Sequence, residues 1–387
     1  MPESILNIRK VVTPEFIFGV GAINLVGQYA INLASRKTMI VTDNGVISAG
    51  WVKYVTDSLQ ENNIPYVIYS DISPNPSEKE VMLGAQLYQE ENCNSLIAIG
   101  GGSPIDCAKG IGIVSSNQGN VLDFEGVDNI QYPIPPLICL PTTAGSSADV
   151  SQFTIINDQN RKVKIAIVSK AVVPDIALID PTTLTTMDNH LTACTGMDAL
   201  THAIEAYVSN ASSSITDLYA LEAVRLITNN LLKTIVKPDD LELRGRMMLG
   251  SLYAGLAFSN AILGAVHAMA HSLGGYLDLP HGECNAILLS HVIDYNYQAC
   301  PEKYCKIGEA MGLNLGGYSL LDKKNLLIDK INQLNKSVGV NKNLSQLGVT
   351  RTDIPLLASN ALNDACLTTN PRDASQRDLE VIYEQAL

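Results

Sequence analysis

SLIAIGGGSPIDCAKG (residues 95–110) is the stretch that decides the fold of this chain. The apolar run at its start predicts a buried strand, which we extend to SLIAIGGGS (95–103), and Gly100–Gly102 predict a tight turn at the end of that strand. Ser103 suits the N-cap of a following helix, Pro104 suits its first position, and Asp106 completes a pattern similar to a capping box. A strand that leads into a helix through glycines is typical of an α/β domain.

The surrounding sequence repeats this alternation. Further strands are predicted at TMIVTD (38–43), PYVIYS (65–70) and PLICLPTTAGS (136–146), with helices running to about residue 62 and over 77–92. Strands that alternate with helices imply a parallel sheet with right-handed crossovers.

Strand signals end near residue 190, and long amphipathic segments follow. Helices are predicted over residues 197–209, 215–235, 240–258, 261–273 and 283–298, with several more to the end of the chain. We therefore expect a Rossmann-like α/β domain over residues 1–185 and an all-helical domain over 186–387. The boundary falls near IALIDPTTL (176–184), where Pro174 and Pro181 interrupt the chain.

Composition excludes several classes of protein. With 387 residues, 46% hydrophobic and 17% charged, the chain is globular, and its net charge of −13 argues against nucleic acid or an anionic membrane as the main partner. Its eight cysteines form no CxxC pair, so we expect reduced thiols in a cytoplasmic protein. No signal peptide is evident in MPESILNIRK, and no apolar run reaches the roughly 18 residues of a membrane span.

Five side chains of metal-ligand type lie within residues 198–281. They are Asp198 and His202 in GMDALTHAIEAY, His267 and His271 in HAMAHSLGG, and His281 in PHGECNA. Each of the first two pairs is spaced i,i+4, which places both members on one face of a helix. We expect Gly274–Gly275 to end the second helix, so that the chain returns to bring His281 near His267. One carboxylate and three imidazoles suit Zn²⁺ or Fe²⁺, so one of the five candidates is surplus.

Residues at the ends of the predicted strands suggest a nucleotide site. Gly101, Gly102 and Ser103 could receive a pyrophosphate at a helix N-terminus, although a strand-to-helix turn also uses glycine for structural reasons and GGGS is not the GxGxxG fingerprint. Asp43 could accept hydrogen bonds from an adenosine ribose and repel a 2′-phosphate, which favours NAD over NADP, or it could cap a turn. Asn75 in SPNP, and Thr142, Thr143 and Ser147 in PTTAGSS, fit either ligand contacts or local backbone caps.

The sequence resembles the iron-containing (group III) NAD-dependent alcohol dehydrogenase family over essentially its whole length. The motifs that carry the resemblance occur in the family's order: GGGSPIDCAKGIGI, PTTAGSSADVSQFTII, GMDALTHAIEAYVS, AGLAFSNAILGAVHAMAHSLGG, PHGECNA and TNPR. The resemblance implies a dinucleotide-binding domain, a helical domain, an active site in the cleft between them, and a homodimer or larger assembly.

Site residues follow from the same motifs. The resemblance implies that Asp198, His202, His267 and His281 bind Fe²⁺, with Zn²⁺ as the alternative, and that His271 lies near substrate and nicotinamide as a proton relay. It implies NAD contacts for Asp43, Asn75, Gly102, Ser103, Thr142, Thr143, Ser147 and Lys164, and it places Phe258 in the substrate pocket or, equally, in the core. The expected reaction is reversible hydride transfer between a primary alcohol or small diol and NAD, with the metal polarising the alcohol or carbonyl oxygen.

Three departures and three alternatives accompany this interpretation. Asp149 stands where the family usually has glutamate, Cys194 where a small apolar residue is usual, and Ser272 where several relatives have glutamine. Within enzymes, a glycerol or polyol dehydrogenase uses the same scaffold. An NAD-using lyase or synthase of the dehydroquinate synthase type is disfavoured because the motifs near the metal lack the Lys/Arg cluster that a phosphorylated substrate needs. A non-catalytic NAD-sensing or filament-forming protein has no need of complete ligand sets.

Overall fold

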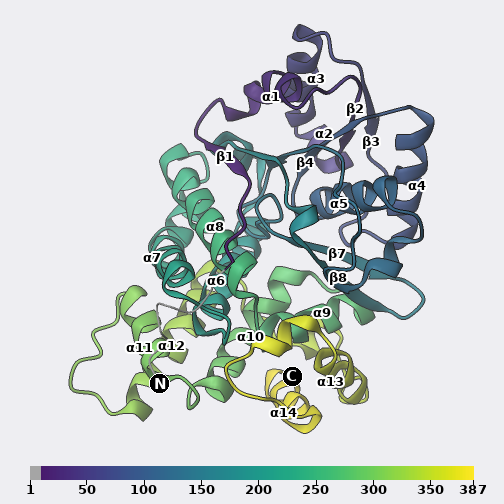
Figure 1. Ribbon diagram of the computed structural model, residues 1–387. Helices are drawn as coiled ribbons and strands as arrows, with labels where there is room; N and C mark the ends of the chain where they lie inside the picture. The colour runs from purple at the N-terminus through teal and green to yellow at the C-terminus, as the bar shows by residue number, and fades with distance from the viewer. Residues whose placement is uncertain (1–9) are drawn as a thin grey trace. The chain divides into compact units, whose positions relative to one another are not determined.

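A computed structural model describes residues 10–387 (Figure 1). Contacts divide the described residues into two compact units, Val12–Met187 and Asp188–Leu387, and Lys10 and Val11 group with the second. The sequence predicts this boundary after residue 185.

The first unit contains a six-stranded sheet in which every pairing is parallel. The strand order is β1-β9-β6-β4-β2-β3. The strands are β1 (Glu15–Phe18), β2 (Thr38–Val41), β3 (Tyr66–Tyr69), β4 (Ser95–Gly100), β6 (Leu137–Pro141) and β9 (Ile176–Ile179). The four predicted strands and the parallel sheet are thus confirmed, whereas β1 and β9 were not predicted.

Each central strand buries both of its faces, as expected of a parallel sheet covered by helices. In β4, Leu96 and Ala98 belong to one hydrophobic core, and Ile97 and Ile99 belong to the other. Helices α4 (Glu78–Glu90) and α5 (Gly102–Ser116) cover the first face. The second face is covered by α1 (Val26–Asn32), α2 (Asn44–Ser48) and α3 (Trp51–Glu61).

Two features of this unit differ from the prediction. The single helix expected up to residue 62 is two helices, because Gly50 adopts a φ of 86° and begins α3 as its N-cap. A second, three-stranded sheet was also not expected. It consists of β5 (Gly126–Val127), β7 (Phe153–Asp158) and β8 (Val163–Val168), and β7 and β8 pair antiparallel.

The second unit is helical over the residues described. Its helices are α6 (Asn189–Val208), α7 (Ser214–Val236), α8 (Leu241–Ala261), α9 (Ala265–Leu277), α10 (His281–Asn296), α11 (Pro301–Ala310), α12 (Leu320–Val338), α13 (Ile354–Leu362) and α14 (Gln376–Ala386). Helix α6 packs against α7, α8 and α10, and α9 packs against α10 and α13. The all-helical prediction is confirmed.

Two helix boundaries were predicted wrongly. Helix α6 begins at Asn189 rather than 197, because Asp188 caps it by accepting a hydrogen bond from Leu191 N (2.7 Å). Helix α9 runs through Gly274–Gly275 and ends at Leu277, where Asp278 adopts a left-handed φ of 54°.

Within residues 10–387, no single helix has the length and hydropathy of a membrane span. One pair, α8 with α9, passes that test only when taken together, and the two helices are bent by 99° at their junction.

Candidate functional site

Three of the predicted metal ligands converge in the helical unit. One ligand atom each from Asp198, His267 and His281 lies within 4.8 Å of the other two. Asp198 Oδ1 lies 3.6 Å from His267 Nε2 and 3.6 Å from His281 Nε2. They come from α6, α9 and the first residue of α10, so three helices must pack correctly to form the cluster.

His202, the fourth predicted ligand, lies beside this cluster. It is buried on α6, and its ring stacks on His267 at a centroid distance of 4.4 Å. Its other neighbour is Phe258 of α8, whose ring centroid is 4.3 Å away. The predicted pocket residue therefore contacts a predicted ligand.

The cluster suits a divalent cation electrostatically. Burial would raise the pKa of Asp198, but the nearby histidines, His202 first, hold the pKa of that carboxyl well below its usual range. A buried carboxylate beside imidazoles is the donor set that Fe²⁺ and Zn²⁺ accept once the metal displaces the imidazole protons.

Asn285 lies at the centre of the cluster and was not predicted. Its Nδ2 donates a hydrogen bond to Asp198 Oδ1 (2.7 Å) and lies 3.2 Å from both His267 Nε2 and His281 Nε2. Its Oδ1 is buried and has no hydrogen-bond partner among the described residues. A polar amide thus draws together the same three atoms that a cation would bind. The only sequence signal was its position one helical turn after His281.

Glu205 contacts Nδ1 of His267, the ring nitrogen that does not face Asp198, and it was also not predicted. Its carboxylate lies 2.6 Å from His267 Nδ1 and accepts a hydrogen bond from Val266 N (2.6 Å). Nδ1–H therefore faces Glu205, and Nε2 faces Asp198. Burial would lower the pKa of His267, but the nearby carboxylates of Asp198 and Glu205 outweigh it and raise the pKa to about 9.

His271 does not join the converging set. It lies one turn after His267 on α9, and its ring stacks on that of His281 at 5.3 Å. Its Nδ1 lies 2.9 Å from Asp364 Oδ2. With Cys366, these two residues form a second group of potential ligands.

In the α/β unit, most of the predicted cofactor residues lie at one edge of the parallel sheet. Asp43 follows β2, Asn75 follows β3, Gly101–Ser103 follow β4, and Thr142–Ser147 follow β6. From β2 the chain proceeds to β3, which lies on one side of β2. It then crosses to β4 and β6, which lie on the other side of β2, so the strand order reverses at β2. Open α/β sheets bind ligands at the carboxyl ends of strands where the order reverses in this way.

The glycine-rich turn after β4 and the hydroxyl-rich turn after β6 contact each other at this edge. A Cβ at Gly101 would lie 3.2 Å from Thr143 Cγ2, and one at Gly102 would lie 3.0 Å from Ser146 Cβ. Gly101, not Ser103, is the N-cap of α5, and no side chain caps that helix, so the N-cap prediction for Ser103 is wrong. Helix α5 therefore begins with two glycines and has no side-chain cap. Its first backbone N–H groups are available for an anion, as a pyrophosphate requires.

Ser103 and Asp43 make local contacts. Ser103 Oγ donates a hydrogen bond to the backbone oxygen of Pro74, which brings the Asn75 loop next to the glycine turn. Asp43 Oδ1 accepts a hydrogen bond from Val46 N (2.9 Å) and caps α2. The helix cap and the proposed ribose contact are compatible, because a carboxylate accepts several hydrogen bonds.

Lys164 and Ser147 complete the predicted set. Lys164 lies on β8 of the second sheet, and its charge acts on Asp106 in the first turns of α5. Burial is the main cause that raises the pKa of Asp106 to about 7, and Lys109 and Lys164 oppose it. Ser147 adopts a φ of 49°, an uncommon conformation for a residue other than glycine, within the turn after β6.

Comparisons with known proteins identify the chain. Its residues 192–387 match the model of the Fe-containing alcohol dehydrogenase family, C-terminal, and residues 13–181 match that of iron-containing alcohol dehydrogenase. The chain belongs to the iron-containing alcohol dehydrogenase family.

Named relatives agree over nearly full length. A 1,3-propanediol dehydrogenase of Citrobacter freundii is 40% identical over 371 residues, which cover 95% of this chain and 96% of that protein. An NAD-dependent methanol dehydrogenase of Bacillus methanolicus is 36% identical over 376 residues, 97% of this chain and 99% of that protein. A crystal structure of 1,3-propanediol oxidoreductase has a TM-score of 0.95 at 39% identity, covering 98% and 100% of the two chains.

Membership of the iron-containing alcohol dehydrogenase family makes this chain an oxidoreductase of alcohols and aldehydes.

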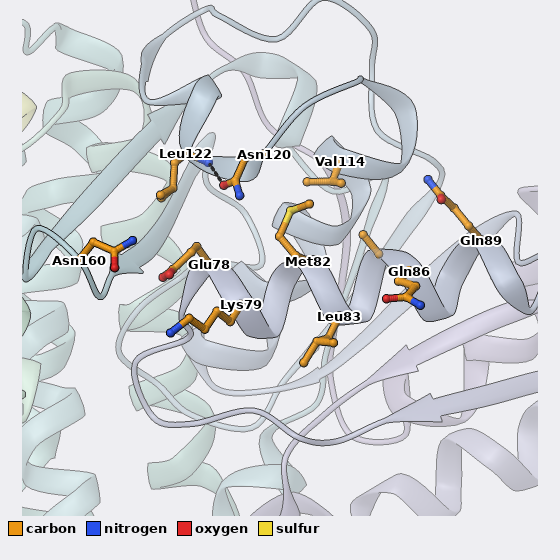
Figure 2. Close-up of a pocket in the computed structure, with 11 residues that line it drawn as sticks. Glu78, Lys79, Met82, Leu83, Gln86, Gln89, Val114, Asn120, Leu122 and Asn160 are labelled. Carbon is orange, nitrogen blue, oxygen red and sulfur yellow. Dashed lines mark hydrogen bonds between the residues drawn. The ribbon is translucent and has the colours of Figure 1, made fainter.

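The α/β unit also has an open groove of about 710 Å³ beside α4. Glu78 and Met82 line the groove from α4 on the side of Asn120 and Leu122, and Leu83 lines it from the other side of the helix (Figure 2). No predicted site residue of this alcohol dehydrogenase is among the lining residues, so the groove is separate from the sites described above.

Proposed function

We propose that this alcohol dehydrogenase catalyses reversible hydride transfer between a small primary alcohol or diol and NAD. The observation that carries the proposal is the convergence of Asp198, His267 and His281 on three helices, with a buried carboxylate among imidazoles. Relatives named as a 1,3-propanediol dehydrogenase and an NAD-dependent methanol dehydrogenase support the substrate class and the cofactor.

The proposed metal ligands are Asp198, His202, His267 and His281. A bound divalent cation supplies Lewis-acid polarisation of the alcohol or carbonyl oxygen. Fe²⁺ is favoured by the family, whereas intrinsic affinity favours Zn²⁺. Glu205 keeps the His267 ring in the orientation that ligation needs, and Phe258 provides an apolar wall against His202.

The proposed NAD contacts lie at the carboxyl edge of the parallel sheet and on β8. The start of α5 would receive the pyrophosphate, and Asp43 would receive the adenosine ribose. The contacts are Asp43, Asn75, Gly101, Gly102, Ser103, Thr142, Thr143, Ser147 and Lys164.

A panel assay tests the proposal. Metal-free protein receives Fe²⁺ or Zn²⁺ and is assayed for NADH formation with methanol, ethanol, butanol, 1,2- and 1,3-propanediol and glycerol, with metal content measured in parallel. We expect turnover that depends on added metal and is highest with a small primary alcohol or diol. Turnover with glycerol alone would support the polyol dehydrogenase instead, and metal-independent turnover would contradict the ligand assignment.

We also propose a cytoplasmic homodimer or larger homo-oligomer. All eight cysteines are free thiols, which suits a reducing compartment, and the family resemblance supports the assembly. Sedimentation velocity tests the assembly, and a monomer at micromolar concentration would contradict it.

A further inference from the structure

Asp364 is a buried carboxylate whose two oxygens have different partners. It follows α13 and caps the short helix η6 (Ala365–Thr369), because its Oδ1 accepts a hydrogen bond from Cys366 N (2.8 Å). Its Oδ2 lies 2.9 Å from Nδ1 of His271. Both side chains are less than a tenth exposed. Of the hydrogen bonds among residues 10–387, the bond to Asp364 is the one that holds the His271 ring.

The ionised state of Asp364 follows from these contacts. Burial would raise the pKa of Asp364, but the charge and hydrogen bond of His271 and the backbone of Cys366 together hold it below its usual value. An ionised carboxylate only accepts hydrogen bonds. The ring nitrogen that faces Asp364, Nδ1, must therefore carry a proton, so that in the neutral form of the ring the lone pair lies on Nε2.

Two further hydrogen bonds hold together the segments that carry Asp364 and His271. Ser272, next to His271, donates from Oγ to the backbone oxygen of Leu357 on α13 (2.9 Å). At the other end, Thr369 Oγ1 of η6 donates to the backbone oxygen of Leu263, just before α9 (2.7 Å). The segment that carries Asp364 is thus tied to the segment that carries His271 on both sides of the pair.

We propose that Asp364 is a positioning residue for the alcohol dehydrogenase reaction. It fixes the plane and tautomer of His271 so that Nε2 presents a hydrogen-bond acceptor to the hydroxyl of the bound alcohol. This inference rests on the proposed function, since the resemblance alone places His271 near the substrate. The arrangement needs no change in the charge of the ring.

The test replaces only the group that faces the histidine. In Asp364→Asn the amide oxygen still accepts from Cys366 N, so the cap of η6 is kept. The amide nitrogen then donates to Nδ1, which moves the ring proton to Nε2 and removes the acceptor. Asp240→Asn is the matched control, because Asp240 caps α8 through Leu243 N and contacts no histidine.

Two measurements decide the outcome. Ring ¹⁵N shifts, assigned with His271→Gln and recorded on Zn²⁺-loaded protein, should show a proton on Nδ1 in the parent and on Nε2 in Asp364→Asn. Turnover number should fall by about 10- to 100-fold, the effect of leaving one buried hydrogen-bonding group without its partner. KM for NAD, metal stoichiometry and thermal midpoint should remain those of the parent, and Asp240→Asn should match the parent throughout.

Three results would overturn the proposal. They are a proton on Nε2 in the parent, a switched tautomer with undiminished turnover, and a loss of turnover that follows a loss of metal or of thermal stability. A parent enzyme that oxidises no alcohol would contradict the proposed function, yet the nitrogen shifts would still decide whether Asp364 sets the tautomer.

Discussion

The His267 imidazole is held by Glu205 on one nitrogen and faces Asp198 with the other. Removing the carboxylate charge should weaken metal binding without removing a ligand. We expect Glu205→Gln to lower the affinity for Zn²⁺ by about 10- to 100-fold, as is usual for partners that orient a ligating histidine. Competition against a chelator measures this change. Glu78→Gln, another buried glutamate, should leave the affinity unchanged, and an unchanged affinity in Glu205→Gln would refute the assignment.

Metal binding should also depend on pH through His267. Its raised pKa of about 9 means that the ring is protonated near neutral pH in the metal-free protein, whereas ligation needs the Nε2 lone pair. Affinity should therefore rise by about tenfold per pH unit as pH increases from neutral toward 9 and level off above it. Titrations of metal-free protein at several pH values measure the slope. A flat profile below pH 9 would show that His267 is not the group whose proton the metal displaces.

Cofactor preference should be set by the charge of Asp43. The residue also caps α2, so Asp43→Gly would remove a cap along with the charge. Asp43→Asn keeps an oxygen for Val46 N and removes only the charge that repels a 2′-phosphate. We expect the ratio of kcat/KM for NADP to that for NAD to rise in Asp43→Asn with thermal stability retained. An unchanged ratio would mean that Asp43 does not contact the ribose.

Spacing along one helix predicted some of these residues and could not predict others. Asp198 and His202 lie one turn apart, so their shared face could be inferred from the sequence. Glu205 lies one further turn along α6, but a glutamate in an amphipathic helix gives no distinct signal. Asp364 is 93 positions from His271, and only the packing of α9 against α13 brings the two together.

Close packing between helices α6 and α10 places His281 against Asp198. A Cβ at Gly282 would lie 2.5 Å from the backbone oxygen of Cys194, a contact that only movement of a helix can relieve. We expect Gly282→Ala to lower both the free energy of unfolding and the affinity for Zn²⁺, because α10 must move away from α6. Gly316→Ala is the control, since its Cβ would meet only Asn314 Oδ1 at 3.5 Å. Parent-like affinity in Gly282→Ala would mean that the cluster tolerates this displacement.

Elements with a long, regular pattern were predicted well, and short or interrupted ones were not. Helices α6 to α10 and strands β2, β3, β4 and β6 emerged from periodicity alone. Strand β5 has only two residues, too few for a periodic pattern, and β1 is an edge strand that pairs with β9. The break at Gly50 and the continuation of α9 through Gly274–Gly275 depend on backbone conformations that glycine permits but does not require.

At the scale of the whole molecule, the described chain forms two compact units that carry different predicted ligands. The metal residues lie on α6, α9 and α10, whereas most of the NAD residues follow β2, β3, β4 and β6. A ligand that binds only the folded form stabilises the part of the chain that forms its site. Each ligand should therefore protect its own unit first.

Hydrogen exchange measured by mass spectrometry tests this separation. Zn²⁺ at a hundred times its dissociation constant adds about 2.7 kcal/mol, which should slow exchange by about a hundredfold for amides that open only when the helical unit unfolds. Peptides from α6, α9 and α10 should show this effect. NAD should instead slow exchange first in the turns after β2, β4 and β6. In His267→Ala the Zn²⁺ effect should vanish while the NAD effect remains. Equal protection of both units by Zn²⁺ alone would show that the helical unit does not open independently of the α/β unit.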